Sequence, residues 1–251
     1  MVDRLRRIVE LLRTHGSLSV AFLAGETGVT EQTIRRDLDR LAAQGQVIRS
    51  HGGATPPPSE PGDDCFTARL SQAADAKRRI AMAAVALVRP GEHIMLDAGT
   101  TTLAIARLLA GHDRIKVITN SVPVATEMAQ RPASDIVLIG GELRVSTLST
   151  VGPMARESFG RLHVQKLFLA ASGIDAERGF TNSNLAEAEI KQAMIAAAEE
   201  VYAVADGSKL GRVLLYSFAA IEQVKALITT ANAPHEALEA IRMRNVDVIL
   251  V

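Results

Sequence analysis

Residues 28–41 are GVTEQTIRRDLDRL, and they decide the fold of the N-terminal part of the chain. Gly28 suits a tight turn, and Thr30 is a natural N-cap for a helix that carries Ile34 and Leu38 on its inner face. A shorter helical segment precedes the turn. Two short helices joined by a glycine-containing turn predict a helix-turn-helix motif.

The outer face of the second helix carries side chains that can contact DNA. Arginine can pair with guanine and glutamine with adenine, while threonine can bind a phosphate or contact a thymine methyl group. In a recognition helix such contacts form at the N-terminal end. The residues that we expect to contact DNA from this helix are Thr30, Glu31, Gln32, Thr33, Arg35 and Arg36.

The segment after this helix predicts a wing. Residues 46–49 are short and apolar enough for a strand, and residues 50–53 then turn the chain back. Arg49 and His51 would lie over the DNA backbone or in the minor groove. A small helical bundle used for protein contacts would show the same helix spacing, and local charge does not separate the two interpretations.

Composition excludes some classes of protein. The 28 Lys and Arg balance the 28 Asp and Glu, so the net charge indicates neither a nucleic-acid nor a membrane partner. Aromatic residues make up only 3% of the 251, which argues against stacking on single-stranded bases. The single cysteine and the lack of a signal-like or membrane-spanning apolar run predict a cytoplasmic protein with no membrane partner.

A proline-rich segment divides the chain. Residues 55–64 contain four prolines, which forbid a helix or a central strand and favour an extended spacer. We therefore expect a winged helix-turn-helix domain over residues 1–54, a spacer over 55–64 and a second domain over 65–251.

The second domain alternates strand and helix patterns. Its strands are apolar along their length, which predicts an α/β fold with a largely parallel sheet covered by helices. The expected strands are His93–Leu96, Lys116–Ile118, Asp135–Ile139, Lys166–Ala170, Glu200–Ala205, Val224–Thr229 and Val246–Leu250.

Polar clusters follow five of these strands, and the carboxyl ends of parallel strands share the edge at which ligands of open α/β folds bind. The five loops are therefore expected to line one pocket. The first cluster, Asp97–Thr102, opens a helix whose N-terminal N–H groups and Gly99 suit a phosphate. Arg144 and Lys209 could supply a positive charge.

Simpler interpretations of the same residues stay open at this point. Thr100, Thr101 and Thr102 could serve only to cap their helix, and Lys209 could be a solvated surface lysine. Glu187 and Lys191 could form an ordinary i,i+4 pair on a helix surface.

Both parts of the chain carry specific motifs. In the first part they are residues 28–30, Thr33–Leu38 and residues 51–54. In the second they are Phe66 with Arg69, Asp97–Thr102, residues 117–121, residues 140–144, residues 173–175, Glu187 with Lys191, and Asp206–Lys209. Through these motifs, both parts of the chain resemble the DeoR family of bacterial regulators.

The resemblance implies a repressor of carbohydrate metabolism whose second domain is similar to sugar-phosphate isomerases and binds a phosphorylated sugar as effector. Carried onto the matching positions, it implies a pocket formed by Asp97, Gly99, Thr100, Thr101, Thr102, Asn120, Gly141 and Lys209. Glu187 and Lys191 join this pocket if their role is functional. The implied partners are double-stranded operator DNA and, because winged motifs commonly bind paired half-sites, a further copy of the chain.

The main alternative is a sugar-phosphate isomerase with an appended DNA-binding module. Asp97, Glu187, Asp206 and Lys209 could in principle do acid–base work in a shared pocket. We expect a regulator and not an enzyme, because attachment to a recognition helix makes binding the more economical explanation. The sequence has no nucleotide-binding glycine motif and no metal-ligand spacing, so no cofactor or metal is expected.

Overall fold

A computed structural model describes residues 2–44, 46–50, 52–56, 66–109, 115–130 and 135–251. The chain divides into two compact units, Met1–Ala68 and Arg69–Val251. His51, residues 57–64 of the spacer and Cys65 lie outside the described residues. The domain limits expected at residues 54 and 65 therefore stay predictions.

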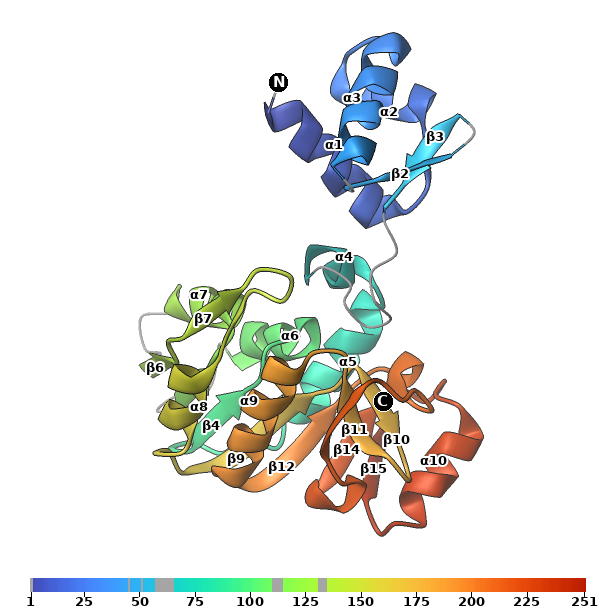
Figure 1. Cartoon of the computed structure of the whole chain (residues 1–251). Helices are drawn as coiled ribbons and strands as arrows, with labels where there is room; N and C mark the ends of the chain where they lie inside the picture. The colour runs from blue at the N-terminus through green and yellow to red at the C-terminus, as the bar shows by residue number, and fades with distance from the viewer. Residues whose placement is uncertain (1, 45, 51, 57–65, 110–114, 131–134) are drawn as a thin grey trace. The chain divides into compact units, whose positions relative to one another are not determined.

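The first unit is a winged helix-turn-helix, as the sequence predicts. Its three strands form an antiparallel sheet in the order β1-β3-β2, which places the wing hairpin beside the helices (Figure 1). The elements are α1 (Val2–His15), β1 (Leu18–Ser19), α2 (Val20–Thr27), α3 (Glu31–Ala43), β2 (Ile48–Ser50) and β3 (Gly53–Thr55).

Local signals fix the limits of α2 and α3. The Ser19 hydroxyl accepts from the backbone N–H of Phe22, and the Thr30 hydroxyl accepts from that of Thr33. Gly28 ends α2 at φ +66°, a left-handed conformation that glycine adopts without strain. Ile34 and Leu38 are fully buried against α1 and α2, so the apolar spacing of the quoted stretch forms the core of this unit.

The second unit is built on a parallel sheet of seven strands in the order β15-β14-β12-β9-β4-β5-β6 (Figure 1). All seven expected strands are present, which confirms the predicted fold class. They are β4 (His93–Leu96), β5 (Lys116–Thr119), β6 (Asp135–Leu138), β9 (Val164–Ala170), β12 (Ala198–Val204), β14 (Ala226–Thr229) and β15 (Asp247–Leu250).

Helices and a small sheet cover this parallel sheet. One hydrophobic cluster joins strand residues such as Leu167 to buried residues of α8, α9, α10 and the small sheet β10-β11-β13. The helices α5, α6 and α7 pack against one another and against the strands. These helices are α5 (Ala74–Val85), α6 (Thr100–Leu108), α7 (Val122–Ala129), α8 (Pro153–Phe159), α9 (Leu185–Ala196) and α10 (His235–Arg242). The boundary between the two units falls within a further helix, α4 (Phe66–Ser71).

Two short antiparallel elements were not predicted. They are the hairpin of β7 (Glu142–Arg144) and β8 (Ser149–Val151), and the small sheet of β10 (Gly173–Asp175), β11 (Gly179–Asn182) and β13 (Tyr216–Ala219). Their strands have three or four residues, too few for a period-two pattern to stand out from the neighbouring loops.

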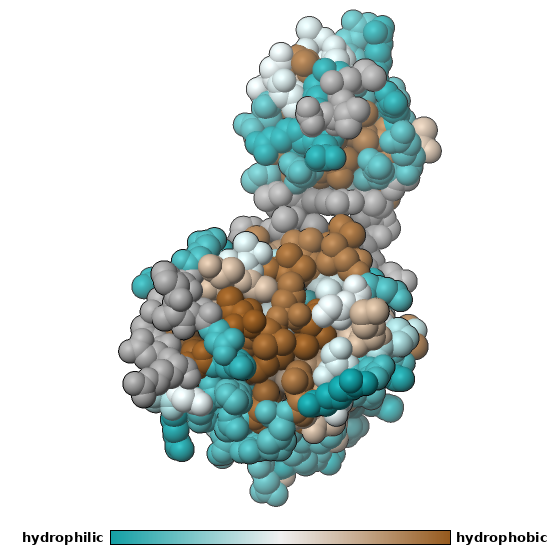
Figure 2. All heavy atoms as spheres, turned by 90° about the vertical axis from the view of Figure 1, so that its left-hand side faces the viewer, coloured by the Kyte–Doolittle hydropathy of each residue, from teal (hydrophilic) through white to brown (hydrophobic). Residues whose placement is uncertain are grey.

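Apolar residues gather on the face of the second unit that Figure 2 turns toward the viewer, the side on which β6, β7 and α8 lie in Figure 1. The exposed large side chains of these elements include Leu138, Leu143 and Met154. The strand β6 is also an edge of the parallel sheet. In the described part of the chain, no helix is both long enough and apolar enough to cross a membrane.

Candidate functional site

The N-terminal end of α3 presents the side chains that the sequence predicts for DNA contact. Glu31, Gln32, Arg35 and Arg36 are exposed, and the Arg35 Nη2 lies 2.7 Å from the Glu31 Oε2. Thr30 and Thr33 are bonded to each other through their hydroxyls at 3.0 Å. Their hydroxyls therefore set the geometry of the helix start, while Gln32, Arg35 and Arg36 extend from it.

A partly buried ion pair holds this helix in place. Asp37 is only 8% exposed, and its Oδ2 lies 2.6 Å from the Arg4 Nε on α1. Hydrogen bonding to Asp37 raises the pKa of Arg4, whose side chain is 27% exposed. The pair ties α3 to α1, which fixes the direction in which the exposed side chains of α3 point.

The wing residue Arg49 has partners within its own unit. Its Nε lies 3.1 Å from the Asp39 Oδ1 on α3, and its Nη1 donates to the Gly53 carbonyl at 3.3 Å. Arg49 therefore braces the wing against α3, and a DNA contact would have to compete with these bonds. The other predicted wing contact, His51, lies outside the described residues.

A cavity of about 230 Å³ opens in the second unit at the carboxyl ends of β4, β9 and β12. This is far above the ~10–15 Å³ that a single water needs. Of the predicted residues it brings together Gly99, Thr100, Thr101 and Lys209. Its other polar lining residues are Arg69, Gln72, Lys77, Asp206, Ser208, Thr230 and Asn232.

The N-terminus of α6 forms one wall of this cavity. Gly99 is the N-cap, and an added Cβ there would lie 3.1 Å from the Ala170 Cβ, so a larger residue would push α6 away from β9. The Thr102 hydroxyl is shared between the carbonyls of Asp97 at 2.6 Å and Gly99 at 3.0 Å. Thr102 therefore ties the start of α6 to the end of β4, whereas Thr100 and Thr101 line the cavity.

The opposite wall contains a buried lysine that the sequence did not single out. Lys77 is 6% exposed and lies on the same face of α5 as the buried Ile80, Ala81 and Ala84. Burial, with Lys209 and Arg69 nearby, lowers its pKa to about 8, and Asp206 opposes the shift. The sequence pattern could have identified Lys77 as a buried residue, because Lys77 falls on the inner face of an amphipathic helix.

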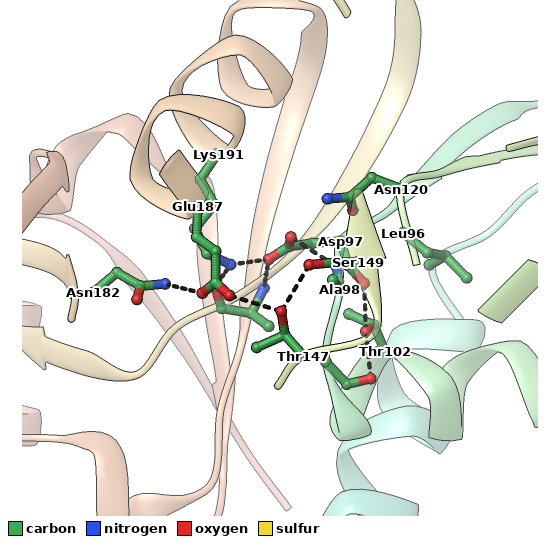
Figure 3. A network of polar contacts seen from close by, with 12 residues as sticks. Leu96, Asp97, Ala98, Thr102, Asn120, Thr147, Ser149, Asn182, Glu187 and Lys191 are labelled. Atoms are coloured by element: carbon green, nitrogen blue, oxygen red, sulfur yellow. Dashed lines mark hydrogen bonds and ion pairs between the residues drawn. The ribbon is translucent and has the colours of Figure 1, made fainter. Parts of the chain in front are cut away.

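A second group of polar residues lies deeper, beside β4 and α9 (Figure 3). Asp97 and Lys191 form an ion pair whose side chains are 2% and 6% exposed. The Asp97 carboxylate also accepts from the backbone N–H groups of Ala98 at 2.7 Å and Ala170 at 3.0 Å. Burial raises the pKa of Asp97, and Lys191 and these N–H groups act against that shift.

Glu187 joins several elements in the same network (Figure 3). Its Oε1 accepts from the Arg144 Nε at 2.9 Å and the Thr147 hydroxyl at 2.8 Å, and its Oε2 accepts from the Asn182 amide at 3.0 Å. Since Lys191 bonds Asp97, the interpretation of Glu187 and Lys191 as an i,i+4 surface pair is wrong.

Asn120 lies at the edge of this network. Its Nδ2 donates to the Thr150 carbonyl at 2.9 Å, but its Oδ1 is buried and has no partner among the described residues. It lines a small cavity of about 10 Å³ together with Asp97, Glu187 and Lys191. That volume is close to the minimum for one water, so this cavity offers room for one small donor.

The expectation that all the loops line one pocket needs correction, because the predicted residues divide between the two cavities. Thr102, Gly141 and Arg144 line neither of these two cavities. At Gly141, with φ +152°, an added Cβ would lie 2.6 Å from the Val151 carbonyl. Gly141 is therefore required by close packing, and Arg144 acts through Glu187.

Two family models match the chain. A model described as "DeoR-like helix-turn-helix domain" matches residues 4–60. A model described as "DeoR C terminal sensor domain" matches residues 72–231, more than half of the chain.

Two known regulators match over almost their whole length. HTH-type transcriptional regulator GlpR of Haloferax volcanii is 37% identical, over 98% of this chain and 96% of its own. Glycerol-3-phosphate regulon repressor of Escherichia coli (strain K12) is 30% identical, over 97% of this chain and 96% of its own. A solved structure of ribose 5-phosphate isomerase A from Methanocaldococcus jannaschii is 19% identical at a TM-score of 0.40, over 54% of each chain.

Proposed function

This chain belongs to the DeoR family of DNA-binding transcription regulators, and from that premise we propose that it represses genes of carbohydrate metabolism under the control of a phosphorylated sugar. The observation that carries the effector part is the larger cavity. There the N-terminus of α6 and the cations Lys77 and Lys209 surround a space in which no described lining residue has an apolar side chain larger than valine.

The chemistry of this cavity favours a phosphate group. The first N–H groups of α6 lack intrahelical partners and carry partial positive charge, and the Thr100 and Thr101 hydroxyls add neutral donors. Lysine ammonium groups bind phosphate as point charges. A dianion would also favour the charged form of Lys77, whose pKa burial has lowered to about 8.

The sugar part of the proposal rests on the relatives and on the polar network beside the cavity. One relative is named for the glycerol-3-phosphate regulon. The Asn120 Oδ1 is a buried acceptor that a hydroxyl group could satisfy. A small phosphorylated polyol or sugar offers both the phosphate and the hydroxyl.

The DNA part assigns base contacts to Gln32, Arg35 and Arg36. DNA sites would first be selected from random duplexes with the full chain. Arg35→Ala and Arg36→Ala should then each weaken binding to the selected site by about ten- to a hundredfold, the loss expected for one base-reading arginine. Arg79→Ala, which removes an exposed charge from α5, is the control. Unchanged affinity in both α3 variants would refute the assignment.

The effector part is tested by thermal unfolding of the full chain against a panel of sugar phosphates and the corresponding free sugars. A ligand that binds only the folded chain raises Tm by mass action. We expect a phosphorylated member to raise Tm and its free sugar to leave Tm unchanged. Replacing Thr100 and Thr101 by leucine should abolish the shift but keep DNA binding; a persisting shift would place the phosphate elsewhere.

We further propose that the chain acts as a homo-oligomer. Winged motifs commonly bind paired half-sites about one helical turn apart, which requires two copies. The exposed Leu138, Leu143 and Met154 and the open edge of β6 supply an apolar surface suited to a second copy.

A further inference from the structure

Arg69 places a buried donor at the larger cavity. It lies in α4, the first helix after the wing, and lines the cavity together with Lys77 and Lys209. Its Nε is buried and has no hydrogen-bond partner among the described residues. An unpaired N–H of a charged group is costly to bury, so this atom marks a position where a ligand acceptor would be stabilising.

Lys77 connects the same cavity to the backbone of α4. Its ammonium donates to the carbonyl of Arg69 and to that of Gln72, just beyond the end of the helix. These carbonyls are among those left without intrahelical partners at a helix C-terminus. An ammonium has three donors, so Lys77 can hold both carbonyls and also bind an anion. The position of α4 thus depends on a side chain that lines the cavity.

The charges around this corner favour an anion. Arg69, Lys77 and Lys209 bring three cations to the cavity, against the single carboxylate of Asp206. That carboxylate already accepts from the backbone N–H and the hydroxyl of Ser208. A phosphate bound here would reduce the repulsion among the cations and pair with the Arg69 Nε.

We propose that Arg69 is a ligand-binding residue of this cavity and that α4 reports its occupancy to the chain segment that leads to the wing. The inference rests on the proposed function, because it assumes a phosphorylated ligand in the cavity. The phosphate contacts Arg69 and Lys77 together only when α4 is docked as in this structure. A ligand that prefers this docked state must stabilise it, and docking must strengthen ligand binding by the same factor.

Hydrogen exchange of the full chain tests this inference. The probes are inorganic phosphate and the sugar phosphate that raises Tm most in the panel. In the unsubstituted chain, a saturating probe should slow exchange at the amides of α4 and at the N-terminus of α6. In Arg69→Gln the probe should bind about tenfold more weakly, and at saturation it should protect α6 without protecting α4.

Two variants make the result specific. Arg79→Gln removes an exposed charge on α5 and should behave like the unsubstituted chain. Arg69→Lys keeps the positive charge but lacks the guanidinium Nε–H donor, so it should recover part of the affinity lost in Arg69→Gln. It also replaces Arg69→Gln in the experiment if that variant unfolds.

The outcomes separate the two proposals. Unchanged affinity in Arg69→Gln and in Arg69→Lys would overturn the role of Arg69 while leaving the cavity as the effector site. Protection of α6 without protection of α4 in the unsubstituted chain would overturn the coupling. Failure of every probe to bind the unsubstituted chain would overturn this inference together with the proposed effector.

Discussion

Replacing Asp97 by asparagine isolates the energetic role of the buried ion pair. The substitution keeps the shape of the side chain but removes the charge that compensates Lys191, and both side chains are at least 94% buried. The Lys191 ammonium would keep the Ala170 carbonyl at 2.9 Å and the face of Phe218, whose ring centroid is 5.6 Å away, but would have at most a neutral amide oxygen in place of the carboxylate. Removing one partner of a buried pair costs about 3–5 kcal/mol, because the other charge stays buried without compensation.

This loss is large compared with the ~5–15 kcal/mol stability of a typical domain. Urea unfolding of the full chain, followed by a probe of the second unit, should show the loss as a lower midpoint with an unchanged slope. Adding Lys191→Met to Asp97→Asn should restore most of the stability, because the unpaired charge is then gone. Glu157→Gln, which breaks the exposed pair with Arg161, is the control and should cost less than about 1 kcal/mol.

The result that refutes this reasoning is a loss below about 1 kcal/mol for Asp97→Asn, or a double variant no more stable than the single one. Either result would mean that Lys191 finds another partner or sheds its proton at little cost. The pair would then be incidental to the stability of the sheet edge that forms both cavities.

Three further predictions follow from single positions. The pKa of Lys77 is about 8, so raising the pH from about 7 to about 9 removes its charge while the phosphate stays a dianion. The Kd of a sugar phosphate, measured by calorimetry, should therefore rise about tenfold, and a constant Kd would exclude Lys77 from the site. Gly53→Ala places a Cβ 2.1 Å from a β1 carbonyl and should abolish DNA binding. Gly25→Ala, on α2 where the added Cβ meets no other atom within 4 Å, should stabilise the first unit by about 0.5–1 kcal/mol in thermal unfolding. DNA binding by Gly53→Ala would show that the wing can adjust. Leu143→Lys with Met154→Lys should lower the mass measured by light scattering to that of a smaller assembly, and an unchanged mass would move the contact between copies to another face.

The sequence predicts most of the fold because its strands and helices carry strong local patterns. In α3, apolar residues recur on one face, and Thr30 caps the helix as expected. The strands of the parallel sheet are continuous apolar runs, which a sheet buried on both faces requires. The hairpin β7–β8 lacks such runs because its strands have only three residues. In the small sheet, β11 pairs with β13 through residues far apart in the chain, such as Phe180 with Ala219.

The site was less predictable because its partners come from distant segments. The partner of Lys191 is Asp97, 94 positions away, while the nearer Glu187 bonds Arg144 on the hairpin. A motif shows that a residue is present, but it does not show in which direction the side chain points or which partner it contacts. The same limit explains Lys77, whose position on the inner face of α5 is visible in the sequence but whose place on the cavity wall is not.

The polar residues divide between the two cavities, and two of the four candidate acid–base residues are already engaged by other groups. A general base must reach a substrate proton, yet Asp97 is occupied by Lys191 and two backbone N–H groups, and Glu187 accepts from three side chains. The space beside them has about 10 Å³, which admits one hydroxyl group but not a sugar ring. The other two candidates, Asp206 and Lys209, line the larger cavity, where cations and a helix N-terminus can hold a phosphate. Asp97 and Glu187 therefore stabilise the sheet edge, and the open cavity beside them is suited to hold an effector whose presence α4 can report.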